Sequence, residues 1–158
     1  MLFNILITLI TFIVMEGVTW FTHKYIMHGF LWILHEDHHD NRKKIHPIFE
    51  KNDAFFLIFA IPSIAMIFTG TYYIQYNYLL FVGIGVALYG LAYFLVHEVI
   101  IHERLKWFSK IDNVYLRALR KAHKVHHKHL GKEDGECFGM LVVPKKYFIE
   151  AKKSKSNK

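Results

Sequence analysis

Three long apolar stretches without a lysine or arginine constrain the fold of this chain more than any other feature. They cover residues 2–22, 54–74 and 78–96. About 20 helical residues, at about 1.5 Å each, cross the roughly 30 Å hydrocarbon core of a bilayer. Each stretch is long enough to span it, and the polar break at 75–77 predicts that the second and third stretches form a helical hairpin.

Positive charge is segregated from these stretches. The 20 Lys and Arg residues outnumber the 13 Asp and Glu residues and give a net charge of +7, which on a soluble surface would suggest a nucleic-acid partner. Every basic residue lies within 23–53 or 97–158, however, and such segregation marks the cytoplasmic segments of membrane proteins. We therefore expect membrane lipid and no nucleic acid as a partner, with all twelve histidines on the cytoplasmic side.

The remaining segments predict a cap on that side of the membrane. The first apolar stretch lacks the basic start and the cleavage site of a signal peptide, so we expect it to stay as a membrane helix. An amphipathic helix is expected over 113–127, and the apolar patch 138–143 is too short to span. The fold class that follows is an all-α integral membrane protein, with about three to four membrane helices and a cytoplasmic helical cap. Residues 1–150 are expected to form a single membrane-embedded domain, followed by a basic flexible tail over 151–158.

Ten of the twelve histidines repeat one order of spacings. In each copy, two histidines five positions apart precede a trio at positions i, i+3 and i+4. These three positions share a helix face, so each trio is predicted to direct its rings to one locus and to hold one metal ion. The two copies are His23, His28, His35, His38 and His39, and then His97, His102, His123, His126 and His127.

The pairs five positions apart need a different local structure. Five residues along an ideal α-helix rotate the second side chain about 140° from the first. We therefore expect His28 and His102 to lie at a helix end, or beyond a local break, so that each pair reaches the site from the end of a membrane helix.

Ten imidazoles exceed the coordination capacity of one ion and predict two metal ions. Spacing alone does not name the metal, because neutral imidazole suits iron, zinc, copper and nickel. A structural zinc usually needs only four ligands, whereas two five-coordinate irons with a position left for oxygen would use the whole set. Cys137 is the only cysteine, which excludes a Cys-based zinc finger. A single histidine is well explained as an exposed polar residue on a helix face, but that explanation does not account for the repeated set.

Other polar residues carry weaker signals. His46 and His129 fall outside the pattern and are expected at the surface or beside the ligands. Glu16 is the one acid inside a predicted membrane helix, and it either acts near the site or bonds a neighbouring helix. Four further acids adjoin the histidines and either orient ring nitrogens or face water: Glu36, Asp37, Glu98 and Glu103.

Five segments on and around the histidines carry a family likeness. They are His23-Lys-Tyr-Ile-Met-His28-Gly29, Phe49-Glu50-Lys-Asn52-Asp53, Ala122-His123-Lys-Val-His126-His127, Gly131-Lys-Glu133 and Phe138-Gly139-Met-Leu-Val-Val-Pro144. Together they resemble the bacterial beta-carotene hydroxylase family, within the wider membrane fatty-acid hydroxylase and sterol desaturase superfamily. The likeness covers about residues 15–145.

The resemblance implies a non-haem di-iron monooxygenase in the bacterial inner membrane, with its metal site facing the cytoplasm. Such an enzyme uses O2 to hydroxylate C3 of the beta-ionone rings of beta-carotene, through cryptoxanthin to zeaxanthin. The ten patterned histidines are then the ligands of two iron ions, with no further catalytic residue, and a ferredoxin with its reductase supplies electrons. Gly83 and Gly85 fit close helix packing rather than a dinucleotide-binding loop. Tyr89, Gly90 and Tyr93 either line a channel for the carotenoid or simply pack.

Two alternatives stay open. The same di-iron centre could act on a sterol, a fatty acyl chain or a ketolated carotenoid, and only the local likeness separates these substrates. The chain could instead be a non-enzymatic membrane protein that binds or transports metal. The second and third apolar stretches carry no ionisable acid or base apart from tyrosines, so no ion path is evident.

Overall fold

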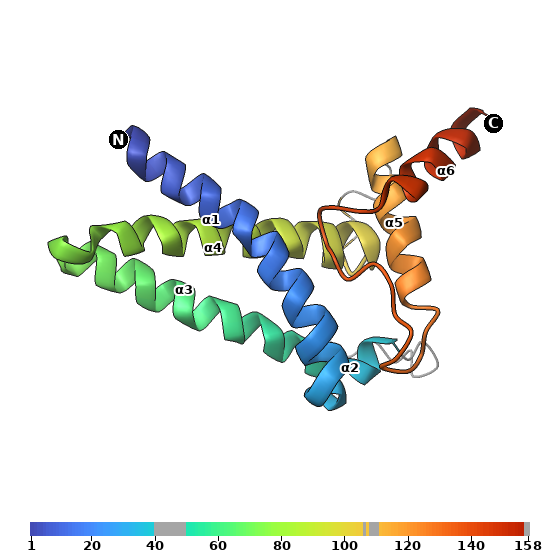
Figure 1. The fold of residues 1–158 in the computed structure, drawn as a ribbon, viewed down its shortest axis with the longest axis horizontal. Coiled ribbons are helices and arrows are strands. Elements are labelled where there is room, and N and C mark those ends of the chain that lie inside the picture. The colour runs from blue at the N-terminus through green and yellow to red at the C-terminus, as the bar shows by residue number, and fades with distance from the viewer. Residues whose placement is uncertain (40–49, 106, 108–110, 157–158) are drawn as a thin grey trace.

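The described part of the chain is built from helices joined by short turns and coil. The computed structural model describes residues 1–39, 50–105, 107 and 111–156, and no strand occurs among them. Long helices lie toward one end of the molecule, and shorter helices with a long coil lie toward the other (Figure 1). The predicted all-α fold is confirmed.

Among the described residues, three helical units are long and apolar enough to cross a membrane, as the sequence predicts. Their outward surfaces stay apolar, and side chains such as Ile13 and Ile64, 71% and 66% exposed, are those that a bilayer covers. The chain is therefore an integral membrane protein. The units are Leu2–Phe30, made of α1 (Leu2–Phe21) and the π-helix η1 (Thr22–Phe30); Lys51–Tyr72, made of η3 (Lys51–Asp53) and α3 (Ala54–Tyr72); and Ile74–Ile101, made of η4 (Ile74–Tyr76), α4 (Asn77–Phe94) and the π-helix η5 (Leu95–Ile101).

Small residues let the three units pack closely. Helices α3 and α4 form the predicted hairpin, and α1 packs against α4. A Cβ atom at Gly83 would lie 2.7 Å from Ile67 Cγ1 on α3, and one at Gly85 would lie 2.7 Å from Thr11 Cβ on α1. The predicted role of Gly83 and Gly85 in close helix packing is confirmed.

An aromatic group marks the membrane surface at the end of α1. The rings of Trp20 and Tyr25 meet edge to face with centroids 6.0 Å apart, and Lys24 Nζ lies 5.1 and 5.2 Å from the two ring centroids. Trp and Tyr concentrate at the level of the lipid headgroups, and lysine extends from there toward water. His23 belongs to the same turn of helix, so the first of the patterned histidines lies close to the membrane surface.

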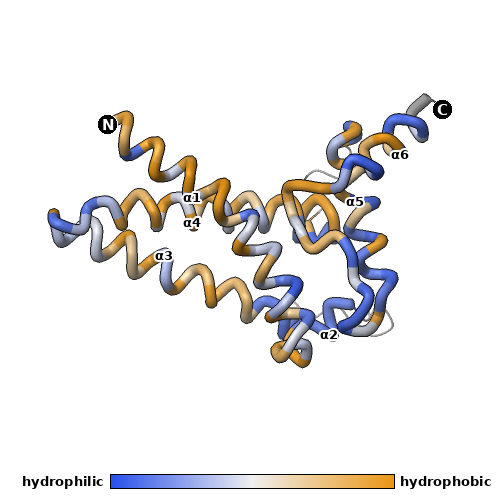
Figure 2. Tube along the Cα trace, viewed as in Figure 1, coloured by the Kyte–Doolittle hydropathy of each residue, from blue (hydrophilic) through white to orange (hydrophobic). Residues whose placement is uncertain are grey.

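The cap consists of α2 (Trp32–His39), α5 (Val114–His126) and α6 (Lys145–Ser156). Hydrophilic residues gather at this end of the molecule (Figure 2). Helix α5 matches the predicted amphipathic helix, and Asn113 Oδ1 caps it by accepting a hydrogen bond from Leu116 N at 2.8 Å.

Helix α6 extends into the segment 151–158, for which the sequence predicts a flexible tail; residues 157–158 lie outside the described part of the chain. The helix continues through Ala151 to Ser156. Tyr147 and Ala151 stand one turn apart on α6, and both are buried against Leu119 and its neighbours on α5. This contact stabilises a helix where the run of lysines alone suggested disorder.

Candidate metal centre

Two π-helices bring the histidine pairs of the membrane units to the cap. A π-helix joins residue i to i+5, so side chains five positions apart come near one face. The hydrogen bond from His102 N to His97 O, 2.9 Å long, shows this winding. His102 ends η5, as predicted. His28 lies one residue before Gly29, whose non-helical backbone kinks η1, so it also ends a helical segment, as predicted.

Nine of the ten patterned histidines converge into two groups. Within each group, one ring nitrogen of every histidine lies within 4.8 Å of those of the others. His97 adjoins the second group, because its Nε2 lies 3.2 Å from His38 Nε2. Site A, as named here, consists of His23, His28, His35, His39 and His126; site B consists of His38, His102, His123 and His127 together with His97.

The structure divides each trio between the two sites, which corrects the prediction that one trio holds one metal ion. Positions i and i+4 differ by about 40° around a helix, whereas i+3 lies about 60° to the other side of i. Two adjacent sites therefore receive the i/i+4 pair and the i+3 residue separately. Helix α2 gives His35 and His39 to site A and His38 to site B, and α5 gives His123 and His127 to site B and His126 to site A.

Hydrogen bonds fix which ring nitrogen faces the centre of site A. Every Nδ1 in this site lies close to a neutral oxygen that can only accept, so Nδ1 carries the proton and Nε2 carries a free lone pair. Four of the acceptors are backbone carbonyl groups and the fifth is an amide side chain. The contacts are His23 to Phe138 O (3.1 Å), His28 to Lys132 O (3.1 Å), His35 to Asn52 Oδ1 (2.7 Å), His39 to His129 O (3.0 Å) and His126 to Glu136 O (2.9 Å).

Carboxylates orient two of the rings in site B. His38 Nδ1 lies 3.1 Å from Glu50 Oε2, and His97 Nδ1 lies 2.5 Å from Glu98 Oε1. Of the four acids considered from the sequence, Glu98 alone orients a histidine among the contacts of the described residues. Glu36 and Asp37 contact Lys51 instead, and Glu103 occupies a turn with φ of 54°.

The Nε2 atoms of site A lie closer together than neutral imidazole rings favour when no ion lies between them. In site A, Nε2 of His35 lies 3.1 Å from Nε2 of His23 and 3.2 Å from that of His39. Because each Nδ1 carries the ring proton, none of these Nε2 atoms has a proton to donate, and their lone pairs face one another. Two ligands at right angles around a metal, with bonds of about 2.1 Å, are about 3 Å apart. The donors therefore fit a bound metal ion.

Burial keeps the cap histidines neutral at pH 7. Loss of solvent, with a smaller effect of neighbouring imidazoles, lowers the pKa of His39 to about 4 and of His126 to about 3. The same causes lower the pKa of His35 to about 2 and of His102 to about 3. The pKa values of His38, His123 and His127 are lowered in the same direction. Neutral imidazole is the form that binds metal, so the site needs little proton release to accept an ion.

Glu16 ties the membrane helices to the segment 135–143, which we call the strap. Its Oε1 accepts hydrogen bonds from the backbone N–H groups of Met140, Leu141 and Val142 at 2.9–3.0 Å, and Oε2 accepts one from the Tyr89 hydroxyl at 2.7 Å. Successive N–H groups of this kind form a nest for an anion, which compensates a carboxylate in a membrane helix. Glu16 therefore bonds a neighbouring helix and also holds the strap, whose Phe138 carbonyl orients His23.

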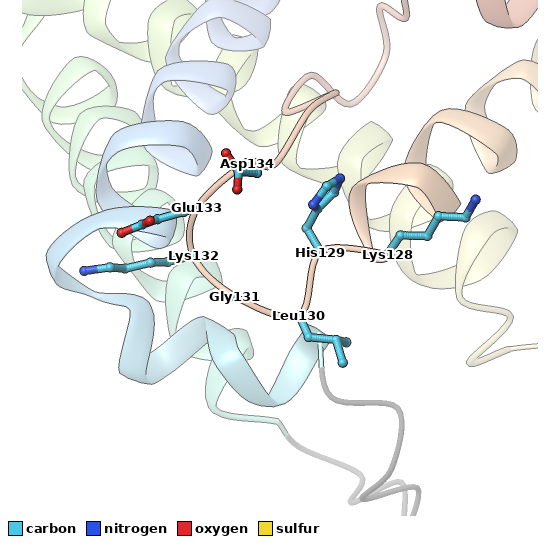
Figure 3. A pocket seen from close by; sticks show the side chains of 7 residues that line it. All are labelled: Lys128, His129, Leu130, Gly131, Lys132, Glu133 and Asp134. Carbon is cyan, nitrogen blue, oxygen red and sulfur yellow. The ribbon is translucent and has the colours of Figure 1, made fainter.

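The loop Lys128–Asp134 turns two backbone carbonyl groups toward site A. The carbonyl groups of His129 and Lys132 accept the bonds from His39 and His28. The side chains splay outward around an open hollow (Figure 3). His129 thus lies beside the ligands through its backbone, whereas His46 lies outside the described residues.

Several residues of the site carried no individual prediction. Glu50, Asn52 and Arg104 lie near the ligands, as do the carbonyl groups above. A readable signal existed for Glu50, which forms a capping box with Asp53 directly before an apolar stretch. Glu50 and Asn52 also lie in one of the five segments that carry the family likeness. The carbonyl groups have no sequence signal, since every residue carries one.

Tyr89 and Tyr93 of α4 lie in different surroundings. Tyr89 is 2% exposed and packs edge to face on Phe12, with ring centroids 5.6 Å apart. Tyr93 lies against site B, its ring centroid 5.0 Å from that of His97. A Cβ atom at Gly90 would meet no neighbour within 4 Å. Among the three residues considered for a channel, Tyr93 is therefore the one placed beside a patterned histidine.

A bundle of three membrane units that ends in two histidine groups defines an integral membrane protein with a histidine-rich site whose geometry fits metal ions. The model of the fatty acid hydroxylase family matches residues 8–144, and the chain belongs to that family of enzymes. The predicted resemblance is confirmed as well. The chain is 41% identical to the beta-carotene hydroxylase of Pseudescherichia vulneris over 151 residues, which cover 96% of this chain and 83% of the relative.

Further relatives come from bacteria and plants. The beta-carotene hydroxylase of Pantoea ananas is 39% identical over 90% of this chain and 79% of its own length. The chloroplastic beta-carotene 3-hydroxylase 2 of Arabidopsis thaliana is 33% identical over 83% of this chain and 42% of its own length. No solved structure gives a significant match.

Proposed function

We propose that the chain is a di-iron monooxygenase that hydroxylates C3 of the beta-ionone rings of beta-carotene, through cryptoxanthin to zeaxanthin. The observation that carries this proposal is the pair of histidine groups, with unprotonated Nε2 atoms about 3 Å apart, at one end of a membrane bundle. The relatives named as beta-carotene hydroxylases support the substrate. Residues 1–150 act as a single membrane-embedded hydroxylase domain in this proposal.

The ten patterned histidines are the proposed ligands, five to each iron. His97 belongs to the set of site B because it is the first member of its π-helix pair, as His23 is in site A. Five histidines would hold each ion and would leave it a position for oxygen. When bound, the two ions supply the O2 chemistry, in which one oxygen atom enters a C–H bond and the other leaves as water at the expense of two electrons and two protons.

The chain's own residues hold and shield the site. The Phe138 ring covers site A, with its centroid 5.1–5.4 Å from those of His23, His28 and His126. An apolar ring at this place excludes water from the reacting groups. Because the sites lie where η1 and η5 end, a substrate dissolved in the hydrocarbon core approaches them without leaving the membrane.

The metal sites face the cytoplasm of a bacterial inner membrane in this proposal, and a ferredoxin with its reductase supplies the electrons. The distribution of positive charge supports the orientation. All Lys and Arg residues lie in the segments that flank or follow the histidines, and positive segments stay on the cytoplasmic side.

Pigment analysis tests the substrate. The chain is expressed in a bacterial strain that accumulates beta-carotene, and the extracted pigments are separated by chromatography. We expect mono- and dihydroxylated carotenoids. Unchanged beta-carotene, with the protein confirmed in the membrane and a reductant present, contradicts the proposal.

The family name favours a second candidate, in which the same centre hydroxylates a fatty acyl chain. Analysis of the acyl lipids from the same cells decides between them. Hydroxylated acyl chains together with unchanged carotene would establish the second candidate.

A further inference from the structure

One arginine joins the two carboxylates that orient site B. Arg104 Nη2 lies 2.8 Å from Glu50 Oε1, and Arg104 Nε lies 2.8 Å from Glu98 Oε2. The other oxygen of each carboxylate faces a histidine, His38 in one case and His97 in the other. Each carboxylate therefore bridges the arginine to a proposed ligand.

The backbone places Arg104 between two membrane units. Glu103 adopts a left-handed conformation with φ of 54°, and the turn is closed by a hydrogen bond from Arg104 N to Glu98 O at 2.9 Å. The guanidinium group then reaches the start of α3, where Arg104 Nη1 also lies 3.2 Å from Asp53 Oδ1. The side chain is 26% exposed, so water screens these ion pairs only in part.

The two sites differ in what holds their rings. In site A, every Nδ1 faces a neutral carbonyl or amide oxygen, whereas two rings of site B face ionised carboxylates. A carboxylate on the outer nitrogen of a histidine makes the inner nitrogen a stronger donor and fixes the ring orientation. Bidentate and paired contacts of arginine hold such carboxylates in a fixed orientation.

We propose that Arg104 is a positioning residue for site B, which acts through Glu50 and Glu98 and makes the two metal ions inequivalent. This inference rests on the proposed two-metal site. Among the contacts of the described residues, Arg104 makes no hydrogen bond to a patterned histidine, and its positioning effect passes through the carboxylates that face His38 and His97. Loss of such an outer contact typically weakens metal binding about 10–100-fold, and here one ion of the two is affected.

Iron titration of the purified full-length chain tests the inference. The metal-free protein is titrated with ferrous iron against a competing chelator without oxygen. We expect two ions for the unaltered protein, and in Arg104→Gln a loss of affinity of about 10–100-fold for one of them. The Mössbauer spectrum of the protein loaded with 57Fe is expected to change in one iron signal only.

Neighbouring residues provide matched controls. Asn52 lies on the same turn as Glu50 but orients His35 of site A, so Asn52→Ala is expected to weaken the other ion. Arg117 pairs with Asp112, and Arg117→Gln is expected to leave both affinities unchanged. Glu50→Gln keeps an oxygen for His38 but removes the charge that Arg104 holds. Like Arg104→Gln, Glu50→Gln is expected to lower the affinity for one of the two ions only. It replaces Arg104→Gln in the test if that variant does not fold.

The outcomes separate the inference from the function on which it rests. Full affinity for both ions in Arg104→Gln and Glu50→Gln overturns the positioning role. An equal loss of both ions in these variants also overturns it, because it would show a general effect on the fold. Failure of the unaltered chain to bind any iron overturns the proposed function, and the inference with it.

Discussion

Individual residues of site A are held by acceptors from three separate parts of the chain. Asn52 begins the second membrane unit, His129 and Lys132 follow α5, and Phe138 lies on the strap. Each ring therefore has one fixed tautomer and one inward nitrogen. The site is assembled by tertiary contacts rather than by any single helix.

Replacing His126 with Ala should abolish hydroxylation and release at least one iron, because the change removes an inward nitrogen of site A. His129→Ala is the matched control. His129 contributes its carbonyl group to the site, and alanine keeps that group. Iron content and product yield of the two variants check this. Full activity in His126→Ala, or loss of metal in His129→Ala, would show that the ligand set is wrong.

The metal-free protein should lose stability as the pH falls below 6.5. The folded chain keeps His39 neutral down to a pKa of about 4 and His126 down to a pKa of about 3, whereas the unfolded chain binds these protons near pH 6.5. The unfolded state then holds more protons, so the free energy of unfolding falls with pH over this window. Thermal unfolding in detergent at pH 7.5 and pH 5.0 should show a fall in Tm of about 5 °C or more. A Tm that rises at pH 5.0 would contradict this.

The sequence predicted the ten histidines, and the structure brings all ten together. That they bind metal stays a prediction. The contacts around them were less accessible to sequence reasoning. Glu98 was considered because it adjoins His97, but Arg104 had no such signal, although it pairs with Glu98 six positions earlier. Its partner Glu50 lies 54 positions away, and only the fold brings them together.

At the level of helices, two π-segments and one strap decide the geometry. The spacing of His23 and His28 indicated a departure from the α-helix, but not which one. A helix end, a break and a wider winding all satisfy the same spacing. The division of each trio between two sites was missed for a related reason, since the i, i+3, i+4 pattern describes one face and does not specify how many loci lie opposite it.

Glu16→Ala should detach the strap and weaken site A. The variant leaves three backbone N–H groups without their acceptor and withdraws support from the carbonyl that orients His23. We expect activity to fall at least about 10-fold, with the membrane helices still folded. Glu16→Gln, which keeps an oxygen in place, should retain more activity than Glu16→Ala. Hydroxylation assays with circular dichroism check both, and equal activity of Glu16→Ala and the unaltered protein would contradict the role.

The whole molecule joins an apolar bundle to a polar cap, and this division was readable from the sequence. Apolar length gave α1, α3 and α4 within two residues at each end, because length and hydropathy alone set what a bilayer accepts. It did not give the π-helical ends of the first and third units. The helical structure of residues 151–156 could not be predicted from the sequence. The lysines of α6 suggested disorder, and the helix depends on contacts of Tyr147 and Ala151 with a helix about 30 residues earlier.

Orientation in the membrane has its own test. Cys137 is the only native cysteine, so a Cys137→Ser background allows single cysteines to be introduced. Tyr76→Cys, in the turn between α3 and α4, should react with a membrane-impermeant maleimide added outside spheroplasts. Lys152→Cys, on α6, should react only after the membrane is opened. The reverse pattern would place the histidines on the outer side.

The most direct test of the central claim is oxygen-isotope labelling with the purified, iron-loaded protein. Beta-carotene, a reduced ferredoxin system and 18O2 are supplied, and the products are analysed by mass spectrometry. The account predicts one 18O atom in each new hydroxyl group, about two iron ions per chain, and no product from His126→Ala. Iron-loaded, reduced protein that yields no oxygenated carotene, or hydroxyl groups whose oxygen comes from water, would contradict it.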